Sequence, residues 1–191
     1  MAEVVPLNFI PIERYWFLTW TTYGSWLPGD ERGYVGFASD EFGRIVNHNR
    51  PHTPPAPPNP ALQRAAQRRL KSPPVRLNRD QAEALLDQFL ETTMHRGWVL
   101  LAAAIMTTHL HLLVGVSGDP EPEKIRDDLK SYGTRCLNRL CGPAPGDAWW
   151  TALGSVRKID GEQSVPNVVH YMRQQPHPLL IWTRDDGRVE C

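Results

Sequence analysis

Two apolar runs that follow each other almost without interruption constrain the fold of this chain more than any other feature. They cover Trp98–Ala104 and Met106–Val116, and both have the length and apolar content of buried strands. The gap between them is far too short for the crossover connection that parallel strands require. The two runs are therefore predicted to form an antiparallel hairpin in the middle of a sheet.

Two more segments have the composition of strands and would extend this sheet. Tyr15–Tyr23 (YWFLTWTTY) consists almost entirely of aromatic and β-branched residues, and Trp149–Ile159 is predicted as a further strand. With the helices described next, the predicted order is β, insertion, α, β, β, α, β, α. We expect an α+β fold in which a four-stranded antiparallel sheet carries helices packed on one face.

Three helices are predicted from capping residues and from apolar side chains at helical spacing. Asn78 can cap the first helix with Gln81 three residues later, and its apolar stripe consists of Ala82, Leu85, Leu86, Phe89 and Thr93. The second opens at Asp119 and Pro120, and its stripe consists of Ile125, Leu129, Tyr132, Cys136 and Leu140. A short last helix would begin at the cap Ser164 and end before Pro176.

Composition adds limits on domain number and location. Lysine plus arginine and aspartate plus glutamate each number 21 in 191 residues, so any nucleic-acid surface must arise from local segregation of charge. The three cysteines are Cys136, Cys141 and Cys191, an odd number without a CxxC pair, which favours a reducing cytoplasm. No export leader or membrane span is expected. We expect one domain over residues 1–191.

Residues 24–78 are predicted to form a loop-like insertion after the first strand. Glycines interrupt its first half, and Arg50–Pro60 holds six prolines in eleven residues, so no packed element is expected there. From Ala61 to Arg79 six side chains are basic and none is acidic. Such a run indicates either a solvated, partly helical segment or a contact surface for nucleic acid.

Two pairs of polar residues could carry chemistry. His109 and His111 bracket Leu110 on a predicted strand, so both imidazoles leave the same face and could offer two nitrogen ligands to a metal ion. Tyr171 and Gln175 are four residues apart and share one face of the last helix. The alternatives are hydrogen-bonded strand histidines and a boundary tyrosine that only packs its ring.

A histidine, a hydrophobic residue and a histidine on a strand, followed by a tyrosine helix with glutamine one turn on, resemble the single-tyrosine HUH transposases. These include insertion-sequence and REP-associated tyrosine transposases, and FLTWTTYGSWLPGDERG is similar to one branch of the latter. The resemblance spans residues 15–175. It implies a ferredoxin-like or RRM-like sheet, and His109, His111 and Gln175 as ligands of Mg²⁺ or Mn²⁺. It also implies Tyr171 as the nucleophile, with a covalent 5′-phosphotyrosine intermediate on hairpin-bearing single-stranded DNA.

The resemblance also implies partners and has one departure. Thr108 stands where many relatives have an acidic residue before the first histidine, so the support of that ring is uncertain. The resemblance leaves monomer and homodimer open, and no membrane partner is expected. The candidate phosphate contacts, each of which could instead be only a solvated side chain, are Arg64, Arg68, Arg69, Lys71, Lys130, Arg135 and Arg139.

Two other functions compete with this interpretation. A metal-dependent phosphodiesterase could use the histidines and a carboxylate to activate water and leave Tyr171 a bystander. A catalytically retired protein could only bind hairpin DNA or RNA. Tyr132 is the competing nucleophile, but its place on the stripe with Leu129 and Cys136 favours core packing.

Overall fold

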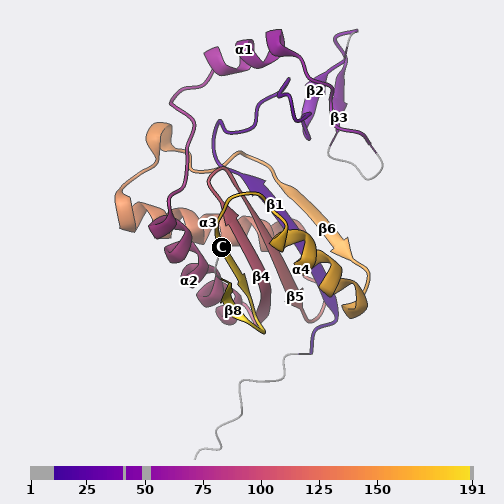
Figure 1. Cartoon of the computed structure of the whole chain (residues 1–191), viewed down its shortest axis with the longest axis vertical. Helices are drawn as coiled ribbons and strands as arrows, with labels where there is room; N and C mark the ends of the chain where they lie inside the picture. Colours follow the sequence, from indigo (N-terminus) through magenta and orange to yellow (C-terminus); the bar gives the residue numbers. More distant parts are fainter. Residues whose placement is uncertain (1–10, 41, 49–52, 190–191) are drawn as a thin grey trace, which may run out of the picture.

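The computed structural model of the protein describes residues 11–40, 42–48 and 53–189. Its main feature is a six-stranded antiparallel sheet in the order β6-β1-β5-β4-β7-β8 (Figure 1). The strands are β1 (Arg14–Thr21), β4 (Trp98–Met106), β5 (His109–Val116), β6 (Ser155–Ile159), β7 (Pro178–Thr183) and β8 (Gly187–Val189). The predicted α+β fold with an antiparallel sheet is confirmed.

The predicted hairpin is the centre of this sheet. β4 and β5 pair from Trp98↔Val116 to Ile105↔Leu110. β1 then pairs with the other edge of β5 along its whole length, from Arg14↔Val116 to Thr21↔His109. The short connection between β4 and β5 makes those two strands antiparallel, and β1 is antiparallel to β5 as well.

The sheet has six strands where four were expected, because the segment after Pro176 was taken to end the fold. Pro178 instead begins β7 opposite Met106, a position at the start of a strand where proline is tolerated. β8 follows and pairs with β7. The predicted strand over Trp149–Ile159 is shorter than expected, since only Ser155–Ile159 joins β1 and Trp150 makes an isolated bridge to Thr22.

Helices cover both faces of the sheet, which corrects the prediction of helices on one face (Figure 1). α2 (Arg79–His95) and α3 (Pro122–Cys141) pack on the face that holds Leu110, Leu112 and Val114. α4 (Val165–Arg173) packs on the other face with Leu113. The continuous apolar run of β5 is typical of a strand buried on both faces, so a second covering layer was already implied.

The two long helices differ in how well their stripes were predicted. In α2 the capping box of Asn78 and Gln81 is present and the whole predicted stripe is buried. In α3 Ile125 and Leu129 are buried as predicted, but the stripe continues through Gly133 and Leu137 while Leu140 is exposed. The buried positions therefore repeat every four residues along α3.

No helix of the described residues is both long and apolar enough to cross a lipid bilayer.

The insertion holds regular elements that its prolines seemed to exclude. β2 (Phe37–Ser39) and β3 (Ile45–Asn47) form a separate two-stranded ribbon, and α1 (Pro60–Arg68) follows. Proline fits the first turn of α1 because no backbone donor is needed there, and the Asn59 side chain caps it. Ala56 is buried and pairs with Tyr34. The segment 53–60 is therefore anchored at Ala56 although most of its residues are exposed, and residues 49–52 of the proline-rich stretch lie outside the described residues.

The remaining parts of the fold are the end of the insertion, two short turns and the start of α4. Val75 and Leu77 are buried in the core beside α2, so the insertion is anchored where it returns to the sheet. The two 3₁₀ turns are η1 (Pro145–Asp147) and η2 (Glu162–Ser164). Ser164 stands at the predicted N-cap of α4, but its hydroxyl donates to the Asp160 carbonyl and does not cap the helix.

Candidate metal and tyrosine site

The two histidines of β5 lie side by side beneath α4. Because they are two residues apart on a strand, both leave the face on which α4 packs. Their ring centroids are 5.2 Å apart and their planes are nearly perpendicular, at 82°. His111 is buried and His109 is half-buried. The prediction that the two imidazoles share a face therefore holds in the structure.

A threonine hydroxyl meets Nδ1 of each histidine. Thr19 Oγ1 lies 2.7 Å from His111 Nδ1, and Thr108 Oγ1 lies 3.2 Å from His109 Nδ1. A hydrogen bond at one ring nitrogen fixes the ring and leaves the other nitrogen for a ligand. Nε2 is thus the nitrogen of each ring that faces away from its threonine and that could bind a metal ion. Thr108, the residue that departs from the family pattern, supports its ring through a hydroxyl.

Burial keeps both imidazoles neutral at neutral pH. Burial is the main cause that lowers the pKa of His111 to about 3, and the neighbouring His109 lowers it further. Burial also lowers the pKa of His109, with a smaller contribution from the positive charge of Arg32. The side chain of Gln175 acts on both rings in the opposite direction as a hydrogen-bond partner. A neutral imidazole is the form that binds a metal ion.

Tyr171 lies beside the histidines and remains accessible. Its ring centroid is 5.7 Å from that of His111 and 6.0 Å from that of Phe17, and the residue is 49% exposed. Phe17 in turn stacks on His111 with centroids 5.2 Å apart. Met172, the next residue of α4, is buried among side chains of β4 and β7. The packing of α4 therefore holds the phenol next to the imidazoles.

The sequence predicted that Gln175 lies within the last helix. In the structure it follows α4 and is not part of it. The helix ends at Arg173, because the residue before Pro176 is restricted to extended conformations. A hydrogen bond of 3.4 Å from the backbone nitrogen of Gln175 to the Met172 carbonyl keeps the chain close to the helix end. Gln175 Nε2 donates to the Tyr171 carbonyl at 3.3 Å, which leaves Oε1 as an oxygen donor for a cation.

The donor set at this site is two imidazole nitrogens and one amide oxygen. Among the described residues no group of three or more histidine, cysteine, aspartate and glutamate side chains could hold a metal ion. Within the described part of the chain, no aspartate or glutamate joins the two histidines in such a cluster. The set itself carries no negative charge, so water or the oxygens of an anionic ligand would complete the coordination of a bound cation.

Sequence reasoning missed the partners of the histidines and the cleft next to them. Thr19 and Phe17 are on β1, and only the pairing Thr19↔His111 and Phe17↔Leu113 reveals that they face the site. The alternation of FLTWT was the available signal. The cleft has a volume of about 430 Å³ and brings residues of the insertion, among them Arg32 and Arg76, to His109 and His177.

Of the seven basic residues predicted to contact DNA, six are exposed and Lys130 is buried. Arg64, Arg68, Arg69 and Lys71 are exposed on α1 and just after it. Arg135 and Arg139 are exposed on α3, on the opposite face of the sheet from the histidines.

Lys130 corrects the prediction, since it is only 8% exposed. Its Nζ donates to the carbonyls of Thr151, Ala152 and Leu153, so it is not available to a phosphate.

Three other aromatic side chains lie away from the histidines. Tyr132 is half-buried on α3, where Arg135 lies over its ring at 5.0 Å, on the far face of the sheet from His109 and His111. Trp149 and Trp150 are both buried, and their indole nitrogens donate to Asn138 and to Thr134 respectively. Neither tryptophan is exposed for base stacking.

Neither a protein-family model nor a curated protein sequence matches the chain. The solved structures that are similar to it include two transposases. One is a REP-associated tyrosine transposase bound to a REP hairpin, with 13% identity and a TM-score of 0.45 over 90% of this chain and 70% of that chain. The other is a candidate transposase from Deinococcus radiodurans R1, with 15% identity and a TM-score of 0.45 over 93% and 99%. Likenesses of this size assign neither a family nor an activity.

Proposed function

We propose that the protein is a metal-dependent single-stranded DNA endonuclease and strand transferase, a transposase of the single-tyrosine HUH type. The observation that carries the proposal is the meeting of His109, His111, Tyr171 and Gln175 at one place under α4. These residues come from a strand, a helix and the segment after that helix. Core packing alone gives no reason for two neutral imidazoles and a phenol to meet beside an amide.

The donor set fits a divalent metal ion, Mg²⁺ or Mn²⁺. Nε2 of His109 and His111 and Oε1 of Gln175 would hold it, and phosphate oxygens of the substrate would supply the missing negative charge. When bound, the ion would neutralise and orient the scissile phosphate. Thr19 and Thr108 would hold the two rings in the orientation that presents Nε2.

Tyr171 would act as the nucleophile. Its hydroxyl oxygen forms a bond to phosphorus while the bond from phosphorus to the 3′ oxygen breaks. The phenol proton passes to solvent, and the leaving oxygen takes a proton from solvent. The products are a 5′-phosphotyrosine and a free 3′ hydroxyl, so the energy of the phosphodiester is kept for rejoining. The exposure of Tyr171 leaves room for a strand to approach it.

The proposed substrate is hairpin-bearing single-stranded DNA. The resemblance of the sequence to REP-associated transposases supports this choice, and so does the exposed basic run on α1. We further propose that Tyr171 acts with the histidines of its own chain, since α4 packs on its own sheet. A mixture of Tyr171→Phe and His111→Ala proteins should then form no adduct, whereas a homodimer with shared sites would restore it.

The test is incubation with a panel of labelled single-stranded hairpins and Mn²⁺, followed by denaturing electrophoresis and mass spectrometry. We expect a covalent adduct on the peptide that contains Tyr171, and none with Tyr171→Phe. Tyr132→Phe is the matched control and should form the adduct normally. Cleavage that persists in Tyr171→Phe would point to a water-activating phosphodiesterase, and binding without cleavage by the wild type would point to a retired hairpin-binding protein.

A further inference from the structure

A second feature of the site is the cleft of about 430 Å³ at its edge, one wall of which is made by the insertion. His109, Thr108 and His177 line the side formed by the sheet and the segment after α4. Arg32, Arg76 and Gln63 line the side formed by the insertion. The cleft therefore begins where the metal and tyrosine site ends, and the residues opposite His109 come from a part of the chain with no role in the proposed chemistry.

Arg32 is held in a fixed orientation on that wall. Its Nε and Nη2 donate to the two carboxylate oxygens of Asp30, at 2.7 and 2.8 Å. Asp30 is only 6% exposed, and it also accepts from the backbone of Arg32 and from Gln63. The guanidinium lies over the ring of Trp26, 5.0 Å from its centroid. A guanidinium fixed in this way has lost its rotamer freedom before any ligand binds.

The loop that carries Arg32 is tied to the histidine strand. Ser25 Oγ lies 3.0 Å from the carbonyl of Thr108, the residue before His109. Trp26 Nε1 donates to the Gly33 carbonyl across the loop at 2.7 Å. Gly29 has a φ of +87°, and a Cβ there would lie 2.2 Å from the Asn59 carbonyl oxygen. The loop is thus braced against both α1 and the turn before β5.

Two groups on this wall are free to bind an anion. Arg32 Nη1 makes no hydrogen bond within the part of the chain that the structure describes, and 49% of the Arg32 side chain is exposed. Arg76 is exposed on the same cleft. The acids of the cleft are Asp30, whose charge is engaged by Arg32, and Glu31, which is exposed.

We propose that Arg32 binds a phosphate of the substrate strand in this cleft, beside the metal and tyrosine site, and that Asp30 is its positioning residue. The inference rests on the proposed function and adds to it a substrate contact from the insertion. The free Nη1 of this fixed guanidinium can donate a charge-assisted hydrogen bond to a phosphate oxygen. The contact would fix the register of the strand relative to Tyr171, since the loop is braced against Thr108.

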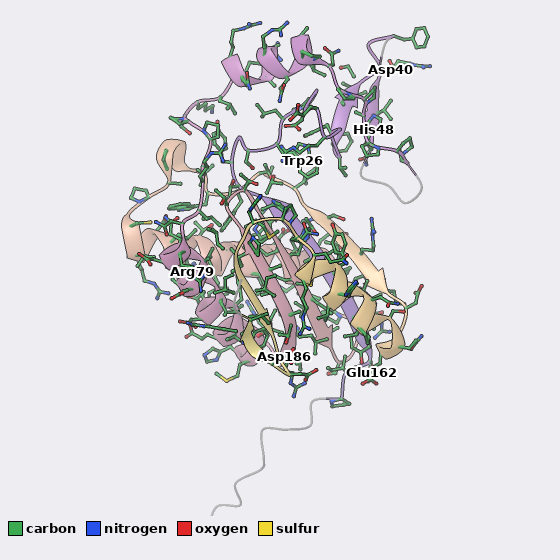
Figure 2. All side chains as sticks on the ribbon, in the orientation of Figure 1. Trp26, Asp40, His48, Arg79, Glu162 and Asp186 are labelled. Atoms are coloured by element: carbon green, nitrogen blue, oxygen red, sulfur yellow. The ribbon has the colours of Figure 1, made fainter. Side chains whose placement is uncertain are left out.

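The insertion also supplies a matched control. Arg44 donates from Nε to Asp40 at 2.9 Å and lies over Phe42 at 5.1 Å, so this trio repeats the arrangement of Arg32, Asp30 and Trp26. Arg44 is not among the residues that line the cleft. Figure 2 shows Asp40 at the far end of the ribbon, whereas Trp26 lies close to the end of the sheet. The two arginines thus differ in place and share their local setting.

The experiment measures equilibrium binding of a fluorescent hairpin-bearing single strand in a Tyr171→Phe background, so that no covalent adduct forms. We expect Arg32→Ala to weaken binding by roughly tenfold to a hundredfold, the loss expected for a charge-assisted contact. Arg44→Ala should change it by no more than about twofold, as for an exposed ion pair. Equal effects of the two substitutions, or no binding of any strand in the panel, would overturn the proposal.

Methylphosphonate linkages identify the phosphate, because each removes the charge of one phosphate. At one position the change should weaken binding when Arg32 is present and have no further effect in Arg32→Ala. Asp30→Asn should reduce the loss of binding that the methylphosphonate causes at that position and at no other. A general loss of folding would alter binding at every position. Additive effects at every position would overturn the proposal. Loss of the Tyr171 adduct in the wild type would overturn only the proposed function, since binding is read without cleavage.

Discussion

The two faces of the six-stranded sheet are covered in different ways. On one face the long helices α2 and α3 bury large side chains, including Trp20 and Phe89, whose rings meet edge to face at 5.9 Å. On the other face the nine-residue α4 rests on Ala102 and Ala104. The histidines, Thr19 and Tyr171 all lie on this second side. The first face therefore holds the larger apolar core, and the second face holds the residues of the proposed site.

The largest effect is expected from the histidines of the α4 face. His109→Ala and His111→Ala should each lower the rate of DNA adduct formation by roughly 10³-fold or more, because each removes a proposed metal ligand. The matched substitution is His95→Ala, which changes an exposed histidine at the end of α2. It should leave the rate unaltered. A normal adduct with either site variant would break the proposed division between the faces.

The next prediction reverses the comparison and concerns the opposite face. Phe89→Ala should lower the free energy of unfolding by about 3–5 kcal/mol, because it empties a fully buried site against Trp20. Urea denaturation measures the loss. The rate per folded molecule should stay close to that of the wild type below the unfolding transition. A large loss of rate in folded protein would show that the two faces are coupled.

A third prediction concerns the support of His111. Thr19→Val removes the hydroxyl next to Nδ1 and keeps the shape of the side chain. Mn²⁺ affinity should fall by about tenfold to a hundredfold, as for the loss of an outer hydrogen bond to a metal ligand. Thr19→Ser keeps the hydroxyl and should restore most of the affinity. Calorimetric titration with Mn²⁺ measures both, and equal affinities of the valine and serine variants would remove Thr19 from the site.

How much could be read from the sequence depends on the distance over which each feature is encoded. The hairpin, the capping box of α2 and the shared face of His109 and His111 follow from residues close together in the chain, and all are present. The Thr19–His111 contact joins residues 92 positions apart. No local pattern fixes that pairing, because it depends on the register of β1 against β5.

The features that were predicted wrongly were also decided by distant contacts. Pro178 reads locally as a terminator, but β4 offers an edge on which β7 can pair. Lys130 reads as a surface base at one position of an amphipathic helix, yet three carbonyls of residues 151–153 receive its ammonium group. The proline-rich segment has the composition of a linker, but backbone hydrogen bonds join Ala56 to Tyr34 and Asn59 to Gly29. In each case the partner lies outside the window that suggested the prediction.

The smallest predicted effect concerns the pH dependence of the Asp30–Arg32 pair, which lies on the insertion side of the cleft. The hydrogen bonds from Arg32 hold the pKa of Asp30 below its usual value. The unfolded chain therefore binds this proton at a higher pH than the folded chain does. The stability that the pair contributes is fully present above the pKa of Asp30 in the unfolded chain. It is lost as the pH falls through the pKa of Asp30 in the folded protein. Asp30→Asn should cost about 1 kcal/mol at pH 7, since Arg32 is half-exposed.

Urea denaturation of both proteins at neutral pH and near pH 3 measures this dependence. The difference between wild type and Asp30→Asn should shrink on acidification, because the unfolded wild-type chain takes up a proton at Asp30 at a higher pH than the folded protein does. The control Asp40→Asn changes the exposed pair with Arg44, where solvent screens the charges and a smaller difference is expected at either pH. A difference for Asp30→Asn that stays constant with pH would mean that Asp30 acts through packing and not through its charge on Arg32.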